Sequence, residues 1–171
     1  MNKTKKEKVV LCLFPNTIGI CYAVFIGIKL IDYGIGYVSP VSNKKSLNRV
    51  MQYINFHNPD VILLRKLSKP KAVLNKRNKE LINAITEVIN SKQRIVLETY
   101  TRNKIQEVFQ LFQVFSKYQI SQKLIYWFPQ LAGYEYPFRK DFMSENHNTG
   151  VFSAVSLAVV YFHDNEYYYD Q

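Results

Sequence analysis

The chain has 171 residues and a mass of 20.1 kDa, enough for one domain and too little for two large cores. Hydrophobic residues make up 47% and aromatic residues 15%, which excludes a disordered chain, and six glycines with six prolines exclude a collagen-like one. The formal charge of +10 favours polyanionic partners; residues 1–104 hold 19 basic and 6 acidic side chains, whereas residues 105–171 hold 4 and 7.

A basic leader precedes an apolar run over residues 9–13. The run is too short for the core of a signal peptide or for a membrane span, and it predicts a central strand covered on both faces. Cys12 and Cys21 lie in apolar stretches without metal-ligand spacing, which argues against a disulfide scaffold or a zinc site. We therefore expect a soluble cytoplasmic protein.

Two further strand patterns follow, over residues 19–25 and 29–38, and the glycine between them, Gly27, predicts an antiparallel hairpin. Apolar residues at helical spacing then predict a helix through Asn55, with Ser46 as its N-cap. Residues 61–67 predict a fourth strand, whose end turns abruptly basic and leads into a charged loop.

The second half of the chain predicts a helix around residues 81–89, a fifth strand over 94–99, and a helix capped by Asn103. Further helices are expected over residues 116–128 and 149–162. The order predicts an α/β fold: three antiparallel strands first, then parallel crossovers, in a five-stranded mixed sheet flanked by helices. Residues 1–163 are expected to form one domain, and residues 164–171 an acidic, tyrosine-rich tail.

Four local sequences follow one another along the chain: LCLFPNTIGICYAVF, PDVILLRKL, IVLETYTRNKIQEVF and GVFSAVSLAVVYF. Their wording and order resemble the ribonuclease H fold, in its branch of RuvC-like Holliday-junction resolvases and their bacterial relatives. The resemblance implies binding of branched DNA, a role in DNA recombination and a homodimer. Active members of the family hold two divalent metals with carboxylates, which activate water against a phosphodiester.

This chain departs from the family at the carboxylate positions. By the resemblance these positions fall on Phe14, Arg65, Gly150 and Ser153, none of which is acidic. A conventional two-metal site is therefore not expected. Only Asp32 and Glu98 are candidates to restore a single metal.

Basic residues near the fourth strand are the candidate nucleic-acid contacts, because Lys and Arg neutralise phosphates. A fixed guanidinium at Arg65 would take over the charge role of a missing metal, although the alternative is that it lies in solvent. Tyr100 is a candidate for base stacking, and Arg102 grips the backbone or pairs with Glu98. The candidate set is Arg65, Lys66, Lys69, Lys71, Lys76, Arg77, Lys79, Tyr100 and Arg102.

A polar loop precedes the last predicted helix. It contains His147, a general-base or ligand candidate whose alternative is an ordinary surface histidine. The aromatic helix end at Trp127 predicts core or a dimer surface. The charged members of the loop are Arg139, Lys140, Asp141 and Glu145.

Three functions remain open from the sequence. The first is a catalytically degenerate RuvC-like protein that binds branched or duplex DNA and needs no cofactor. The second is a Mg²⁺- or Mn²⁺-dependent endonuclease that uses relocated acids, namely Asp32, Glu98, Asp141 or Glu145. The third is a protein-interaction subunit that uses the acidic tail or the helix at Trp127.

Overall fold

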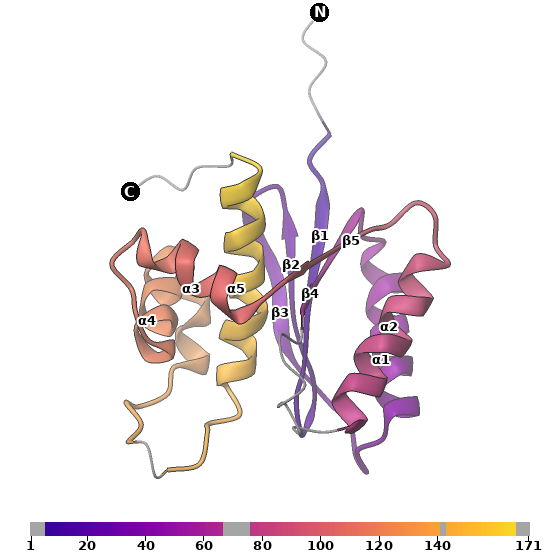
Figure 1. Cartoon of the computed structure of the whole chain (residues 1–171), viewed down its shortest axis with the longest axis horizontal. Coiled ribbons are helices and arrows are strands. Elements are labelled where there is room, and N and C mark those ends of the chain that lie inside the picture. Colours follow the sequence, from indigo (N-terminus) through magenta and orange to yellow (C-terminus); the bar gives the residue numbers. More distant parts are fainter. Residues whose placement is uncertain (1–5, 67–75, 141–142, 167–171) are drawn as a thin grey trace, which may run out of the picture.

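A computed structural model describes residues 6–66, 76–140 and 143–166 of the chain. These residues form the expected five-stranded mixed sheet, and its strand order is β3-β2-β1-β4-β5 (Figure 1). The strands are β1 (Val9–Pro15), β2 (Gly19–Ile26), β3 (Lys29–Tyr37), β4 (Val61–Arg65) and β5 (Val96–Tyr100). The helices are α1 (Asn43–His57), α2 (Lys76–Asn90), α3 (Arg102–Gln110), α4 (Lys117–Trp127), the 3-10 helix η1 (Pro129–Tyr134) and α5 (Thr149–Asp164).

Strand β1 lies in the middle of the sheet, because its apolar run can be covered on both faces. It pairs antiparallel with β2 and parallel with β4, and β4 pairs parallel with β5. The register places Leu13 opposite Leu64, so that Phe14 and Arg65 follow side by side. The end of the central strand is therefore brought next to the basic end of β4.

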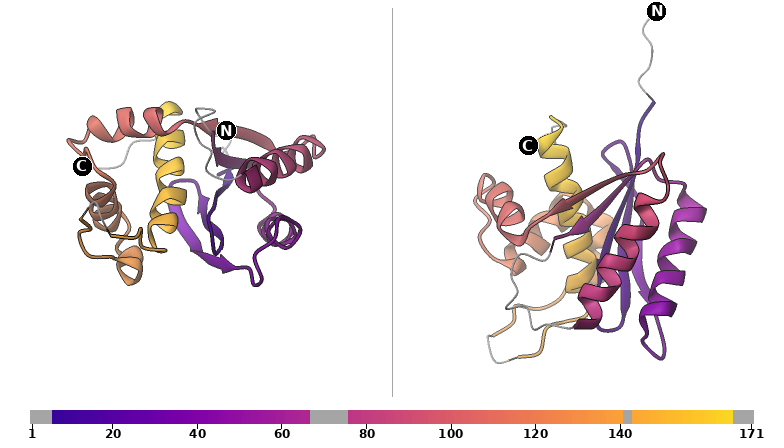
Figure 2. Two further views of the ribbon diagram at one scale, coloured as in Figure 1. Left: turned by 60° about the horizontal axis from the view of Figure 1, so that its bottom comes forward. Right: turned by 45° about the vertical axis from the view of Figure 1, so that its right-hand side comes forward.

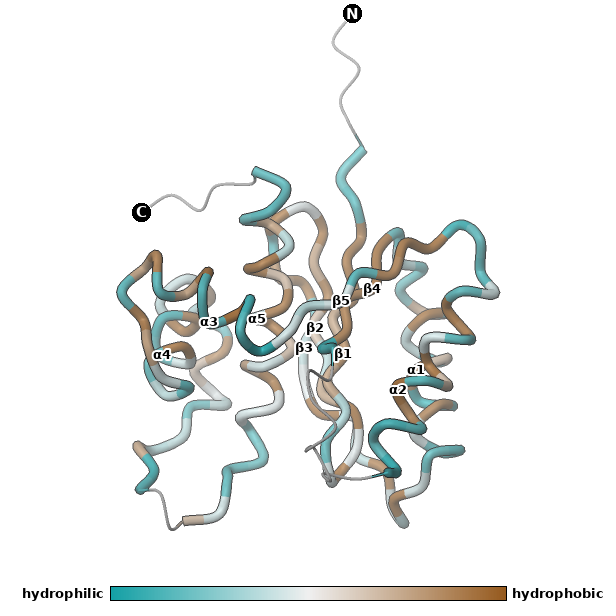
Figure 3. The backbone as a smooth tube through the Cα atoms, viewed as in Figure 1, coloured by the Kyte–Doolittle hydropathy of each residue, from teal (hydrophilic) through white to brown (hydrophobic). Residues whose placement is uncertain are grey.

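Helices cover both faces of the sheet. Helices α1 and α2 pack on one face, and α3, α4 and α5 lie on the other, as both views in Figure 2 show. Every residue of α5 from 150 to 162 except Ser153 is buried, which explains why this helix is apolar nearly all round. Hydropathy follows the layers, with brown concentrated in the central strands and teal in the loop before α5 (Figure 3).

Two helix starts differ from the sequence prediction. Helix α1 begins earlier than expected: Ser42 is its N-cap and accepts a hydrogen bond from the Lys45 backbone nitrogen, whereas Ser46 is buried inside the helix. Helix α3 is capped by Thr101 and not by Asn103. Serine, threonine and asparagine are all good N-caps, so the chosen residue depends on where the preceding strand or loop ends.

The fold gathers several helix starts at one edge of the sheet. Strands β1, β3, β4 and β5 run in the same direction, and α1, α2 and α3 follow β3, β4 and β5 in the chain. Helix α5 also begins there, because its first turn contacts Asn16, just beyond β1. No helix within the described ranges is long and apolar enough to cross a membrane.

Two stacked tyrosines between the sheet and α1 predict sensitivity to alkali. The rings of Tyr22 and Tyr53 lie 4.3 Å apart between centroids. Burial and then the charge of Asp32 raise the pKa of Tyr22, and burial raises the pKa of Tyr53 to about 12. A tyrosine in the unfolded chain ionises at about pH 10. The stabilisation that the protonated rings give the folded state is therefore complete below that pH and is lost as the pH rises toward about 12.

We therefore expect the temperature of the unfolding midpoint to decrease as the pH is raised from about 10 to about 11.5. Each such tyrosine contributes at most about 1.4 kcal/mol per pH unit, and less where the ring is partly exposed. Calorimetry of the wild-type chain and of Tyr53→Phe measures this effect, and the variant should lose stability less steeply. Parallel curves for the two proteins would show that Tyr53 ionises equally in both states.

Candidate nucleic-acid interface

The four positions that the resemblance compares with metal-binding carboxylates lie together in space. Phe14 and Arg65 end neighbouring strands, and the Arg65 guanidinium carbon lies 5.9 Å from the centroid of the Phe14 ring. Gly150, in the first turn of α5, faces Cys21, which is the β2 partner of Phe14. Ser153 lies one turn further along α5 and lines the same cavity as Arg65.

The electrostatics around Arg65 are dominated by cations. Arg65 is half-buried and has no ion-pair partner among the residues that the structure describes. Burial, and then the positive charge of Arg102, lower the pKa of Arg65, while the charge of Glu145 raises it. An anion placed between the two guanidinium groups would relieve this repulsion.

Glu145 does not neutralise this group by itself, because it is held by a lysine. Its Oε1 lies 2.6 Å from the Lys117 Nζ. Partial burial acts to raise the pKa of Glu145, but the hydrogen bond and charge of Lys117, helped by the charge of Arg139, outweigh it and hold the pKa below its usual range. Arg65 and Lys117 thus share the negative charge of Glu145, which Lys117 already pairs.

The donor atoms at this place do not suit a divalent metal. Mg²⁺ requires oxygen ligands, and a two-metal site is built from carboxylates. The Phe14 side chain supplies no oxygen, and among the described residues no Asp or Glu lines the cavity beside Arg65. Ser153 donates its hydroxyl proton to the backbone oxygen of Thr149 at 3.0 Å. Across residues 6–66, 76–140 and 143–166, no three His, Cys, Asp or Glu side chains gather at one point.

The predicted rescue pair, Asp32 and Glu98, is wrong. Asp32 lies on β3 and Glu98 on β5, at opposite edges of the sheet. They also face opposite sides: Asp32 pairs with His57 of α1 at 3.1 Å, whereas Glu98 accepts a hydrogen bond from the hydroxyl of Tyr100 on the α5 face. Because the two carboxylates lie at opposite edges and on opposite faces of the sheet, they cannot bind the same metal ion.

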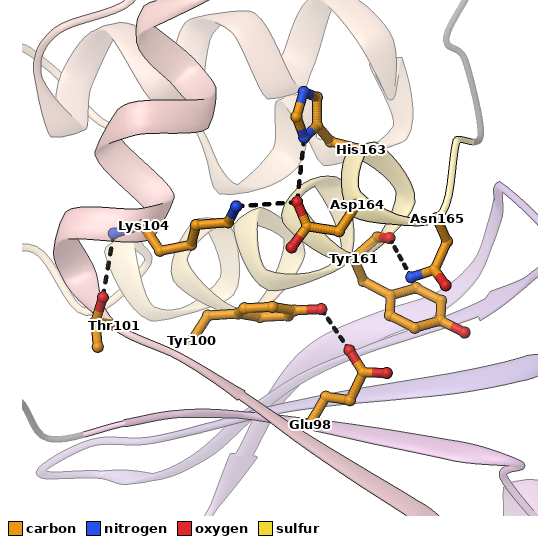
Figure 4. Close-up of polar contacts among 8 residues, drawn as sticks. All are labelled: Glu98, Tyr100, Thr101, Lys104, Tyr161, His163, Asp164 and Asn165. Atoms are coloured by element: carbon orange, nitrogen blue, oxygen red, sulfur yellow. Dashed lines mark hydrogen bonds and ion pairs between the residues drawn. The ribbon is translucent and has the colours of Figure 1, made fainter.

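Figure 4 shows the polar contacts around Glu98 and around the C-terminal end of α5. The Tyr100 hydroxyl points to Glu98 at 2.6 Å, and Lys104 reaches Asp164, near the C-terminal end of α5, at 3.0 Å. Asp164 lies about 16 Å along the helix from Ser153, at about 1.5 Å per residue. Glu98 is therefore engaged by Tyr100 on its own strand, and the neighbouring ion pair of Lys104 ties α3 to the C-terminal end of α5.

Two further expectations at the end of β5 are not supported. The ring of Tyr100 is only 8% exposed and packs in the core, so it offers no face to a nucleic-acid base. Burial and the bond to Glu98 raise its pKa. The alternative ion pair between Glu98 and Arg102 does not form. Arg102 is exposed and instead lines the cavity with Arg65.

The other predicted basic contacts have mixed surroundings. Lys66, Lys76 and Lys79 are exposed, and the side chain of Lys76 is 91% exposed although its Nζ lies 3.9 Å from Glu80. Arg77 is partly buried, and its backbone oxygen accepts a hydrogen bond from Asn43. Three predicted residues lie outside the described residues, namely Lys69, Lys71 and Asp141.

The fold adds cations that sequence reasoning did not single out. Lys44 and Lys45 occupy the first turn of α1, and Lys117 is the first residue of α4. The signal in the sequence was a basic first turn without an acid, a pattern that opposes the helix dipole. We call the combined set the cationic edge: Lys44, Lys45, Arg65, Lys66, Lys76, Lys79, Arg102 and Lys117.

The remaining candidates stay peripheral. His147, Arg139 and Lys140 are exposed in the loop before α5. The ring of Trp127 packs against the core and meets Phe112 edge to face at 4.9 Å, in agreement with the expectation of a core position. The predicted tail begins inside α5, which includes Asp164, and residues 167–171 lie outside the described part of the chain.

Gly150 provides a test of how tightly α5 packs at this site. A Cβ at this position would lie 2.5 Å from the Cys21 Sγ and 3.0 Å from the Asn16 Nδ2. Gly→Ala inside a helix normally stabilises by about 1 kcal/mol, but overpacking costs about 1–3 kcal/mol. We expect Gly150→Ala to destabilise the protein in urea unfolding.

The matched variant is Cys21→Ala, which removes the sulfur atom that the new methyl group would meet. The double variant should be more stable than the sum of the two single changes predicts, by about 1 kcal/mol or more. Additive effects would show that the contact between α5 and β2 is looser than the structure indicates.

Solved structures of Holliday junction resolvases share this architecture. Thermus thermophilus RuvC, in complex with a Holliday junction substrate, aligns with a TM-score of 0.61 at 12% identity, over 94% of this chain and 97% of that chain. The yeast mitochondrial resolvase Ydc2 aligns at 0.61 and 12%, over 91% and 78%. The fowlpox virus resolvase, bound to its Holliday junction DNA, aligns at 0.54 and 14%, over 92% and 98%.

These identities are low, so the likeness establishes the fold and the placement of the elements. No protein-family model and no curated protein sequence matches the chain. The chain thus has the RuvC-like arrangement of the ribonuclease H fold, with a five-stranded mixed sheet and flanking helices.

Proposed function

Starting from the fold of RuvC-type Holliday junction resolvases, we propose that this chain binds branched or duplex DNA at its cationic edge and leaves the strands uncut. One observation carries the proposal. Arg65 lies over Phe14 and beside Arg102, where the resemblance would place metal-binding carboxylates. A site built to seat cations is replaced by one that repels them and attracts phosphate.

The helix starts support the same ligand. Helices α1, α2, α3 and α5 begin at the cationic edge, and none has an acidic residue in its first turn. The first turns of α1, α2 and α3 carry cations, although a cation at this end of a helix costs about 0.3–1 kcal/mol. Phosphate groups at the edge would meet both the positive helix ends and these side chains, which offsets that cost.

Hydrolysis lacks its usual means at this place. Arg65 can hold a phosphate through a bidentate hydrogen bond, but a guanidinium does not activate water. The carboxylate whose charge acts on Arg65 is that of Glu145, and it is paired with Lys117. The alternative of an endonuclease with relocated acids has weaker support, because Asp32 and Glu98 are far apart.

The finer parts of the proposal rest on the fold alone. By likeness to the resolvases, the chain would act as a homodimer in bacterial DNA recombination in the cytoplasm. The two cysteines are buried free thiols, which suits a reducing compartment.

Fluorescence anisotropy with a labelled four-way junction and a matched duplex tests the binding. With about six phosphate contacts, affinity should fall roughly a thousandfold between about 50 and 200 mM salt. A linear decrease of log affinity with log salt is the expected result. No binding of either DNA at about 50 mM salt, where counterion release favours it most, would contradict the proposal.

A further inference from the structure

A cavity of about 60 Å³ lies between α3, α4 and α5, next to Arg65. Its exposed lining includes Arg102, Phe115 and Lys117, so the cavity meets solvent on this side. Its buried lining is apolar and includes Ile105, Val114 and Phe152. The cavity therefore combines a cationic entrance with an apolar interior.

Two serines on one face of α5 add hydrogen-bond acceptors to the cavity lining. Ser153 donates its hydroxyl proton to the Thr149 backbone oxygen at 3.0 Å, and Ser156 donates to the Ser153 backbone oxygen at 2.7 Å. Each hydroxyl oxygen keeps lone pairs while its proton is engaged. The serines are therefore set to accept hydrogen bonds from an N–H group in the cavity.

We propose that this cavity receives the single-ring base of one unpaired nucleotide, whose phosphate lies between Arg65 and Arg102. The inference rests on the proposed DNA-binding function and specifies which part of the DNA occupies the cavity, namely one unpaired nucleotide. It assigns the base to the apolar lining and its ring N–H to the hydroxyl oxygens of Ser153 and Ser156, which share it as acceptors.

The chemistry of the cavity distinguishes this ligand from simpler ones. A free phosphate would use the arginines and leave the apolar lining unused, whereas an apolar molecule would bury beside a charge that it cannot compensate. A volume of about 60 Å³ corresponds to about four to six water molecules, at about 10–15 Å³ for each. That room suits one pyrimidine ring better than the two fused rings of a purine.

The test compares two duplexes that differ only at one position, an unpaired thymine or an abasic spacer. The wild-type protein should bind the duplex with the unpaired thymine about tenfold more tightly, at the lower end of what one stacked base contributes. Ser153→Leu fills the cavity and should abolish this preference while changing affinity for the abasic duplex less than about twofold. Ser156→Ala keeps the space and removes one acceptor, so it should reduce the preference in part.

The matched control is Ser91→Leu, an exposed serine at the end of α2 whose hydroxyl also donates to a backbone oxygen of its own helix. It should leave the preference unchanged. Calorimetric titration with thymidine 5′-monophosphate separates the two sources of the ligand. One outcome is that the wild type binds the free nucleotide, Ser153→Leu does not, and the two duplexes bind equally. That outcome would support the site, with a free nucleotide as its occupant.

An intact wild-type protein that binds both duplexes equally and does not bind the free nucleotide would overturn the inference while leaving the proposed function standing. Failure to bind any DNA would instead contradict the proposed function. In that case the titration with the free nucleotide would still decide whether the cavity takes this ligand.

Discussion

Replacing Lys44, Lys45, Lys76 and Lys79 with glutamine should weaken binding to a four-way junction roughly four thousandfold at about 0.1 M salt. At that concentration each lost phosphate contact removes about 0.9 of a decade from the affinity, and the salt slope should fall by about 0.9 for each contact. Folding should not suffer. Removing cations from the first turns of α1 and α2 relieves the opposition to the helix dipole, so the thermal midpoint should rise slightly.

A control with the same change in net charge is available at the other end of the molecule. Lys6, Lys8, Lys29 and Lys92 lie near the opposite ends of the strands and helices. Their replacement by glutamine should change junction affinity less than about fivefold, because charges beyond a Debye length are largely screened. Equal losses in the two quadruple variants would show that net charge, and not the cationic edge, drives binding.

The second large effect is expected at Arg65. Arg65→Met keeps an apolar side chain of similar length beside Phe14 and removes the guanidinium. A charge-assisted hydrogen bond contributes about 1.5–3 kcal/mol, so the dissociation constant should rise about 10- to 100-fold. Protein stability should stay equal or increase, because burial and the charge of Arg102 both disfavour the charged side chain in the free protein.

The comparison variant is Arg94→Met, an exposed arginine in the turn before β5. It should bind the junction like the wild-type chain, within about twofold. Anisotropy titration and thermal melting of both variants provide the two readouts. Loss of stability in Arg65→Met without loss of affinity would assign Arg65 a structural role in place of a phosphate contact.

The architecture of the sheet could be predicted because its signals are local. The apolar run of β1, the hairpin of β2 and β3 and the alternation of later strands with helices determine the strand order. The resemblance then placed Phe14, Arg65, Gly150 and Ser153 at one point, and the strand register and the packing of α5 bring them there.

The details that could not be predicted depend on faces and depth in the fold. Asp32 and Glu98 look equivalent in the sequence, but the strand register pairs Asp32 with Val24 on the α1 face and Glu98 with Leu63 on the α5 face. Tyr100 follows a strand and precedes a basic helix start, yet the packing of α5 buries its ring. Lys117 joins the site only because α4 lies beside α3 and α5.

Binding without cleavage is tested most directly by measuring complex formation and strand cleavage in the same sample. The wild-type chain is mixed with an end-labelled four-way junction at about 50 mM salt with Mn²⁺, at a concentration that converts all DNA to complex on a native gel. The same sample is then separated on a denaturing gel. The account predicts complete complex formation with every strand at full length. The opposite result, which would contradict the account, would be strands that the wild type nicks near the branch point and that the Glu145→Gln variant leaves intact.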